Sequence, residues 1–146
     1  MNYTVLVTGA CSPAGRSMLA ALHREPLELL ACDNSLFWPC EAPGSGRFEI
    51  GVSDGPEFVG DLVRLCVAQH VDVVLPMRAA DQAALAPVRG LFEDLGTSVW
   101  LGPIPEHATR AQMRRILLSA ESRFSRGRMG DWLRRLSILV PAAVKR

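Results

Sequence analysis

The sequence predicts a doubly wound α/β domain built on a mostly parallel sheet of five strands. Short apolar runs recur along residues 1–105, segments with helical spacing of apolar residues separate them, and Gly or Pro marks most boundaries. Near-continuous apolar strands are typical of parallel sheets buried on both faces, and right-handed crossovers lay the helices on alternate sides. The 146 residues, 49% of them hydrophobic, suffice for one such domain with its own core.

The first elements are the most clearly marked. Residues 3–8 are predicted to form a strand, because the run is β-branched or apolar from its second residue onward. A helix over 13–24 follows, with Pro13 in its first turn, where a missing N–H costs no hydrogen bond. The apolar run 27–33 predicts the second strand.

The same signals predict the rest of the sheet. Pro39, Pro43 and Gly44 mark residues 34–46 as a loop. Gly96 stands where a left-handed cap is favoured, so it ends the last helix before the fifth strand. The remaining predicted strands are 47–50, 71–75 and 97–101, and the remaining predicted helices of this region are 54–70 and 81–95.

Residues 106–146 are predicted to form a basic helical tail after an α/β domain over 1–105. From residue 107 onward ten Arg or Lys stand against two acids, whereas the preceding residues carry six Arg against thirteen acids. Amphipathic spacing predicts helices over 107–119 and 131–140. Such a tail can lie against an acidic surface of its own protein or of a partner; few aromatic residues accompany the charges, so nucleic acid is not an expected partner.

Composition also bears on compartment and on metal binding. No window approaches the roughly 18 apolar residues that span a bilayer, and no basic region precedes an apolar stretch at the N-terminus, so we expect a cytoplasmic protein with no membrane partner. Cys11, Cys32, Cys40 and Cys66 form no C-x-x-C pair, and no His stands at ligand spacing from them. We therefore expect buried thiols, with neither a metal site nor a disulfide framework.

The candidate site is the loop that joins the first strand to the first helix. In doubly wound sheets the ligand crevice lies at the carboxyl ends of the strands, and a helix N-terminus there offers free N–H groups to an anion. The residues predicted to bind substrate or cofactor lie in this loop and after the second and central strands: Gly9, Ala10, Cys11, Ser12, Pro13, Ala14, Gly15, Asp33, Arg78 and Asp81. No residue is predicted to be catalytic or to bind a metal.

One ligand considered for this loop is a dinucleotide. Gly9 and Gly15 match the outer glycines of the dinucleotide-binding fingerprint, and Asp33 ends the second strand, where an acid would bind a ribose hydroxyl. Ser12 stands where the middle glycine would let the backbone approach the pyrophosphate closely. NAD or NADP binding therefore stays open.

Few side chains offer catalytic chemistry. Catalysis by a Tyr-Lys pair is excluded, because the sole Tyr is Tyr3 and the sole Lys is Lys145. Cys11 has no evident base, so a structural thiol is favoured over a nucleophile. Arg78 is suited either to contact a carboxylate or phosphate or to face solvent, and Asp81 is expected to cap the helix that follows.

Four segments then combine into a known pattern. They are the strand and loop Val5–Gly15, the acid Asp33, the strand Val71–Pro76 followed by Asp81, and the helix end and strand Leu91–Pro103. The combination resembles the N-terminal, Rossmann-like pre-ATP-grasp domain of ATP-grasp enzymes of the carbamoyl-phosphate synthetase large-subunit-like group. The resemblance covers about residues 3–105.

The resemblance implies a domain that helps form the substrate cleft of an ATP-dependent carboxylate–amine ligase. In that family, later domains hold ATP and magnesium and activate a carboxylate as an acyl phosphate. An ATP-grasp module or subunit is therefore the expected partner, and a small anionic or carboxylate molecule is the expected ligand. Family members carry an Asp-Lys pair on the helix after the fifth strand, where this sequence has Arg110-Ala111-Gln112.

Two functions remain after these steps. The first is a pre-ATP-grasp unit that is not catalytic alone and needs an ATP-grasp partner. The second is a Rossmann-like module that binds NAD(P) or another nucleotide without autonomous catalysis. An independent enzyme is disfavoured because no base, metal site or usable Lys accompanies the loop, and an open sheet edge leaves a homodimer as a further expectation.

Overall fold

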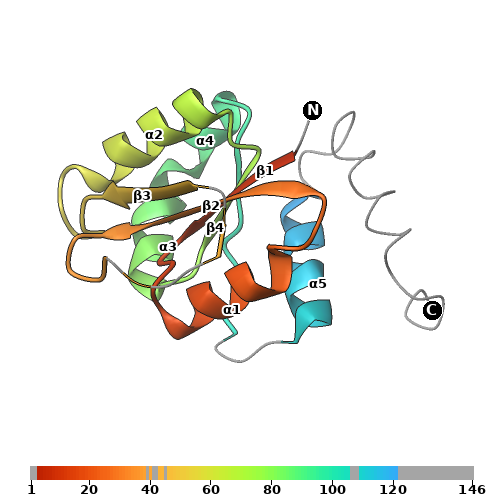
Figure 1. Cartoon of the computed structure of the whole chain (residues 1–146). Helices are drawn as coiled ribbons and strands as arrows, with labels where there is room; N and C mark the ends of the chain where they lie inside the picture. Colours follow the sequence, from red (N-terminus) through yellow and green to blue (C-terminus); the bar gives the residue numbers. More distant parts are fainter. Residues whose placement is uncertain (1–2, 39, 41–42, 45, 106–108, 122–146) are drawn as a thin grey trace.

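The computed structural model describes residues 3–38, 40, 43–44, 46–105 and 109–121. The strands are β1 (Tyr3–Thr8), β2 (Leu27–Asn34), β3 (Gly46–Ile50), β4 (Val73–Pro76) and β5 (Ser98–Val99). The helices are α1 (Pro13–Leu22), α2 (Phe58–Gln69), α3 (Ala79–Leu85), α4 (Arg89–Asp94) and α5 (Arg110–Glu121), with a 3-10 turn η1 (Ala86–Val88). The five strands pair in parallel in the order β3-β2-β1-β4-β5 (Figure 1), which confirms the doubly wound, Rossmann-like fold.

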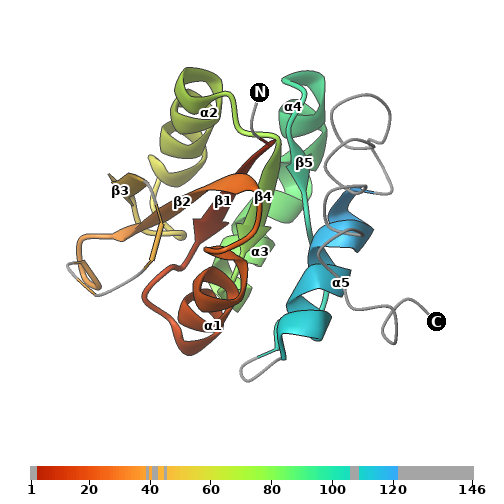
Figure 2. The ribbon, with the colours of Figure 1, turned by 45° about the vertical axis from the view of Figure 1, so that its right-hand side comes forward.

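Alternate residues of β1 feed two separate cores. Val5 and Val7 pack with α1 and α5 on one face of the sheet, whereas Leu6 packs with residues of α2, α3 and α4 on the other. All three side chains are fully buried. Figure 2 shows α1 and α5 on one side and α2 and α4 on the opposite side. This burial of β1 on both faces explains why its sequence is apolar without alternation.

Two predicted helices differ in extent from the observed ones. The helix expected over 81–95 is observed as α3, the 3-10 turn η1 and α4. Pro87 lies in the turn, and because proline has no N–H it cannot donate to the carbonyl four residues earlier. The helix expected over 54–70 begins only at Phe58. Gly96 does take the left-handed conformation, with φ +82°, and follows α4 as predicted.

Helix α5 packs against α1 through apolar and charged side chains. Met113 and Leu117 are fully buried in the core on this face of the sheet. The carboxylate of Glu25, which is 0% exposed, accepts hydrogen bonds from the guanidinium groups of Arg110 at 2.5 Å and Arg114 at 2.6 Å. Part of the positive charge of this C-terminal region is therefore neutralised by an acid of the same chain.

The structure describes only part of the predicted tail. The helix predicted over 131–140 lies outside the described residues, and the domain boundary after residue 105 stays a prediction. Among the helices that the structure describes, none combines the length and apolar character needed to cross a bilayer.

Candidate ligand crevice at the carboxyl edge of the sheet

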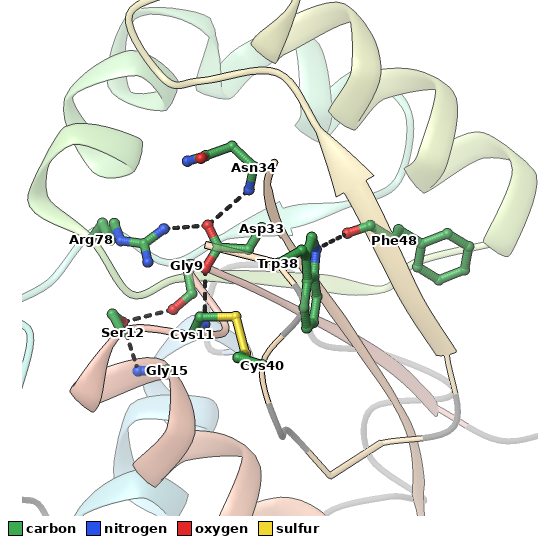
Figure 3. Close-up of a disulfide and its surroundings, with 10 residues drawn as sticks. All are labelled: Gly9, Cys11, Ser12, Gly15, Asp33, Asn34, Trp38, Cys40, Phe48 and Arg78. Atoms are coloured by element: carbon green, nitrogen blue, oxygen red, sulfur yellow. Dashed lines mark hydrogen bonds and ion pairs between the residues drawn. A yellow bond between two sulfur atoms is a disulfide. The ribbon is translucent and has the colours of Figure 1, made fainter. Parts of the chain in front are cut away.

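The carboxyl ends of β1, β2 and β4 bring the predicted site residues together. The loop 9–15 follows β1, Asp33 lies near the end of β2, and Arg78 and Asp81 follow β4. The carboxylate of Asp33 accepts a hydrogen bond from the loop and pairs with Arg78 (Figure 3). The predicted residues therefore lie along one edge of the sheet, as expected for a doubly wound fold.

Two glycines and a serine give the loop its shape. Gly9 has φ +61°, a conformation that side chains disfavour. Ser12 caps α1: its Oγ accepts from the Gly15 N–H at 3.0 Å and donates to the Gly9 carbonyl at 2.6 Å. A Cβ on Gly15 would lie 2.1 Å from the Gly9 carbonyl oxygen, so only glycine fits there. Pro13 occupies the first turn of α1, as predicted.

Most amide groups of the loop are already hydrogen-bonded. A pyrophosphate cradle requires N–H groups that point, unpaired, at the ligand. Here the loop amides donate within the protein: Ala10 to the Cys32 carbonyl at 3.1 Å, Cys11 to Asp33 Oδ2 at 2.9 Å, Ser12 to the Gly9 carbonyl at 3.0 Å, and Gly15 to Ser12 Oγ. A dinucleotide phosphate would have to displace these bonds.

Asp33 is engaged by protein groups on both carboxylate oxygens. Oδ1 pairs with Arg78 Nη1 and accepts from the Asn34 N–H at 2.8 Å, while Oδ2 accepts from Cys11. The Arg78 side chain is 19% exposed, and its guanidinium carbon lies 3.9 Å from the centre of the Phe37 ring. Arg78 therefore does not face solvent, and in this conformation its anionic partner is Asp33.

A disulfide overturns the prediction of four buried thiols. Cys11 in the β1–α1 loop is bonded to Cys40 in the β2–β3 loop, with their Cα atoms 5.9 Å apart (Figure 3). The sequence offers no motif for this pair, because the two residues are 29 positions apart and meet only through the parallel pairing of β1 with β2. Disulfides are typical of oxidising compartments, and cytoplasmic location stays a prediction.

The other two cysteines are buried thiols, as predicted. Cys32 is 0% exposed and Cys66 is 2% exposed. Burial, with the charges of Asp81 and Asp33 adding to it, raises the pKa of Cys32 well above its ordinary value. Burial raises the pKa of Cys66 to about 12 although a hydrogen bond with Thr97 opposes the shift. Both groups are therefore protonated and unreactive at neutral pH.

Asp81 does not cap a helix, contrary to the prediction. Helix α3 begins at Ala79, two residues before Asp81, and Arg78 stands at the N-cap position, where its side chain makes no capping hydrogen bond. Asp81 instead accepts from Thr8 Oγ1 at 2.8 Å and is 4% exposed. Burial raises the pKa of this carboxyl, while the Thr8 hydrogen bond and the Arg78 charge lower it. The Asp81 side chain thus ties α3 to the end of β1.

A hollow of about 490 Å³ opens where the strand order reverses, between β1 and β4. It has the volume of a small-molecule site, and the reversal of strand order is where doubly wound sheets bind ligands. Ser12 and Arg78 supply its polar groups. The lining residues are Ser12, Pro13, Ala14, Met77, Arg78, Ala79, Ala80 and Ile104. Four of the predicted residues, Ser12, Pro13, Ala14 and Arg78, thus line one hollow.

Sequence reasoning missed the β2–β3 loop as part of the crevice. Besides Cys40, it supplies Phe37, which lies against Arg78, and Trp38, whose Nε1 donates to the Phe48 carbonyl at 2.7 Å. A signal was available, since loops after neighbouring parallel strands emerge at one edge. Among the described residues, no group of three His, Cys, Asp or Glu side chains is arranged to hold a metal ion.

The fold and the crevice define a Rossmann-like α/β domain with a hollow at its topological switch point. No protein-family model matches the sequence, and a search of curated proteins finds no match. Among solved structures, glycinamide-RNase-transformylase T from Mycobacterium tuberculosis superposes on 66% of this chain with a TM-score of 0.46 and 22% identity. A structure described as "AtPrR2 in apo form" superposes on 81% with a TM-score of 0.49 and 17% identity. The matched regions span 28% and 45% of those two chains.

Proposed function

We propose that this chain is a pre-ATP-grasp domain, the substrate-cleft part of an ATP-dependent carboxylate–amine ligase that acts together with an ATP-grasp module. The hollow between β1 and β4 is the observation that carries the proposal. It is the right size for a small molecule, it holds Arg78 at its wall, and it lies at the start of α1. A guanidinium group suits bidentate contact with a carboxylate or phosphate, so a small anion is the ligand class.

The chain contributes binding and orientation in this proposal. Arg78 would exchange its partner Asp33 for the ligand carboxylate or phosphate, and Ser12 would orient the ligand from the cap of α1. The ATP-grasp module would hold ATP and magnesium, which supply the phosphoryl group that activates a carboxylate. The sequence likeness over residues 3–105 supports this division of labour.

The alternative, a module that binds NAD(P), is favoured by one observation. Asp33 lies at the carboxyl end of the strand next to β1, where ribose-binding acids stand in dinucleotide-binding domains. Against it weigh the pairing of Asp33 with Arg78 and the occupied amides of the loop. A dinucleotide would require both sets of contacts to open.

Ligand-induced thermal stabilisation separates the two functions. Inorganic phosphate and malonate, each at millimolar concentration, should raise the Tm of the wild-type chain, and NAD and NADP should not. Ala80→Leu places a larger side chain at the hollow and should abolish the shift. Ala68→Leu, at an exposed position of α2, is the matched control and should keep it. Stabilisation by NADP alone would favour the dinucleotide alternative, and no shift with any anion would overturn the ligand class.

The partner is tested separately. An ATP-grasp module encoded in a neighbouring reading frame should copurify with this chain on co-expression. The complex should release ADP from ATP and magnesium only when a carboxylate substrate is added, and neither protein should do so alone. A stable chain that binds no such module would contradict the proposal even if the hollow takes anions.

A further inference from the structure

The hollow between β1 and β4 is walled mainly by apolar side chains. Of the described residues that line it, Ser12 and Arg78 have side chains with nitrogen or oxygen atoms. The other lining residues are apolar: Pro13, Ala14, Met77, Ala79, Ala80 and Ile104. Apolar walls with a few well-placed polar groups are typical of sites for small organic molecules. A bare inorganic ion would leave most of this wall unused.

Ser12 has no proton to offer a ligand in the hollow. Its Oγ donates to the Gly9 carbonyl at 2.6 Å, lies 3.3 Å from the Met77 carbonyl and accepts from the Gly15 N–H at 3.0 Å (Figure 3). A serine hydroxyl has one proton to donate, and here the protein itself uses it. Ser12 therefore gives this wall its shape and leaves the recognition of charge to Arg78.

Arg78 is suited to a single carboxylate. Its guanidinium group carries five N–H donors in a planar fork that matches the two oxygens of a carboxylate, and the pairing with Asp33 runs through Nη1. Phosphate has more oxygens than one guanidinium can satisfy. Those that face apolar side chains would lose their hydrogen bonds to water, which is unfavourable. The donors of the hollow thus favour a carboxylate over a phosphate.

The apolar wall is continuous with the core on the α1 face of the sheet. Ala14 and Met77 are buried members of that core cluster, and Ile104 is half-buried against it. An alkyl chain that lies on these side chains removes apolar surface from water on both partners, which is favourable. The hollow therefore offers a place for a hydrocarbon chain beside the guanidinium group.

We propose that the ligand of the hollow is an aliphatic monocarboxylate, whose carboxylate binds Arg78 and whose alkyl chain lies on Met77 and Ile104. The inference rests on the proposed function, because it takes the hollow to be an anion site and names the anion. The substrate acid of the proposed ligase is then an aliphatic one.

NMR titration with butyrate, pentanoate and hexanoate tests the inference. The amide resonances of Ala79 and Ala80 report binding at the hollow. Each added methylene should tighten binding about two- to fourfold, as expected for partial to full burial of the group. Hexanoate should also bind more tightly than inorganic phosphate. Hexan-1-ol has the same chain without the charge and should bind more weakly than hexanoate, by about tenfold or more.

Two isoleucine variants separate the apolar wall from general loosening of the core. Ile104→Ala should remove most of the gain per methylene. Ile116→Ala is the matched control, since Ile116 is also half-buried against the same core cluster but does not line the hollow, and it should keep the gain. Arg78→Gln should weaken all three acids by about the same factor, because the charge they share is recognised there.

The outcomes distinguish this inference from the proposed function. Equal affinities for the three acids, in a chain that still binds phosphate and malonate, would overturn the aliphatic ligand and leave the anion site standing. Hexan-1-ol binding as tight as that of hexanoate would overturn the role of Arg78 in holding the ligand. A chain that binds neither the acids nor phosphate would contradict the proposed ligand class, and the inference with it.

Discussion

The carboxyl edge of the sheet divides at β1 into two halves that differ in how they are filled. On the β2 side, Asp33 binds Arg78 and the Cys11 amide, and a disulfide fastens the loop above. On the β4 side, a hollow of about 490 Å³ is left between the start of α1 and the residues after β4. The half that would hold the ribose of a dinucleotide is thus filled by the protein itself, and the half at the strand reversal is open.

This contrast explains why the same glycine loop can serve different ligands. In a dinucleotide-binding domain the loop amides and the acid after the second strand work together. Here Ser12 replaces the middle glycine, and its hydroxyl closes the loop on itself through Gly9 and Gly15. The loop therefore forms a wall of the open half, and in the proposed function Arg78 recognises the ligand there.

The loop between the two halves should tolerate no added atoms at Gly15. Gly15→Ala would bring a Cβ against the Gly9 carbonyl oxygen and should lower the free energy of unfolding by about 3 kcal/mol or more. Gly90→Ala in α4, where a Cβ meets nothing within 4 Å, should instead raise it, by up to about 1 kcal/mol. Urea denaturation measures both. Equal effects of the two substitutions would contradict the packing of the loop.

The two partners of the ion pair in the closed half should contribute unequally to the free energy of unfolding. Asp33→Ala leaves the largely buried Arg78 without its carboxylate and should cost about 3 kcal/mol. Arg78→Ala should cost less, about 1–2 kcal/mol, because Asp33 keeps the amides of Cys11 and Asn34 as partners. Urea denaturation of both variants shows which substitution costs more stability. A larger loss in Arg78→Ala would show that the backbone donors do not support the buried carboxylate.

The free energy of unfolding should depend on pH through Asp81, which is buried where the two halves meet. Because burial raises the pKa of Asp81, the native protein keeps its proton at pH values where the unfolded chain has lost it. This contribution to stability is present below the ordinary value of 3.8 and is lost as pH rises through the higher native pKa. The stability of wild type relative to Asp81→Asn should therefore fall as pH rises from about 4 into the neutral range. Urea denaturation of both proteins across that range tests it, and a difference that rises or stays constant would contradict the direction.

The open half should tolerate a larger side chain with little loss of stability. Ala80 is exposed at the hollow, so Ala80→Leu should change the free energy of unfolding by no more than about 0.5 kcal/mol. Ala68→Leu on α2 provides the reference for an exposed helical alanine. A loss well above that of the reference, measured by urea denaturation, would mean that the hollow is packed.

The sequence was sufficient to predict the fold and most of one wall of the candidate site. The apolar run of β1, Pro13 and the two loop glycines predicted a strand, a turn and a helix that the structure reproduces. These features are local, because each depends on neighbours within a few residues. The break at Pro87 follows from an equally local rule, because proline cannot donate the helical hydrogen bond.

The errors at the site involve partners distant in the chain. The disulfide joins cysteines 29 positions apart, and Asp81 bonds to Thr8, 73 positions away. Both contacts follow from the order β2-β1-β4, which pattern alone does not fix. Local rules gave Asp81 a cap role and Cys11 the role of a free thiol, and tertiary contacts overrode both.

Calorimetric titration of the wild-type chain with inorganic phosphate and with NADP tests the central claim most directly. The account predicts that phosphate binds, that Ala80→Leu abolishes its binding while Ala68→Leu does not, and that NADP gives no binding heat. NADP binding that is lost in Asp33→Asn, with no effect of Ala80→Leu on any ligand, would contradict it. That result would mean that the β2 half of the edge opens to a dinucleotide.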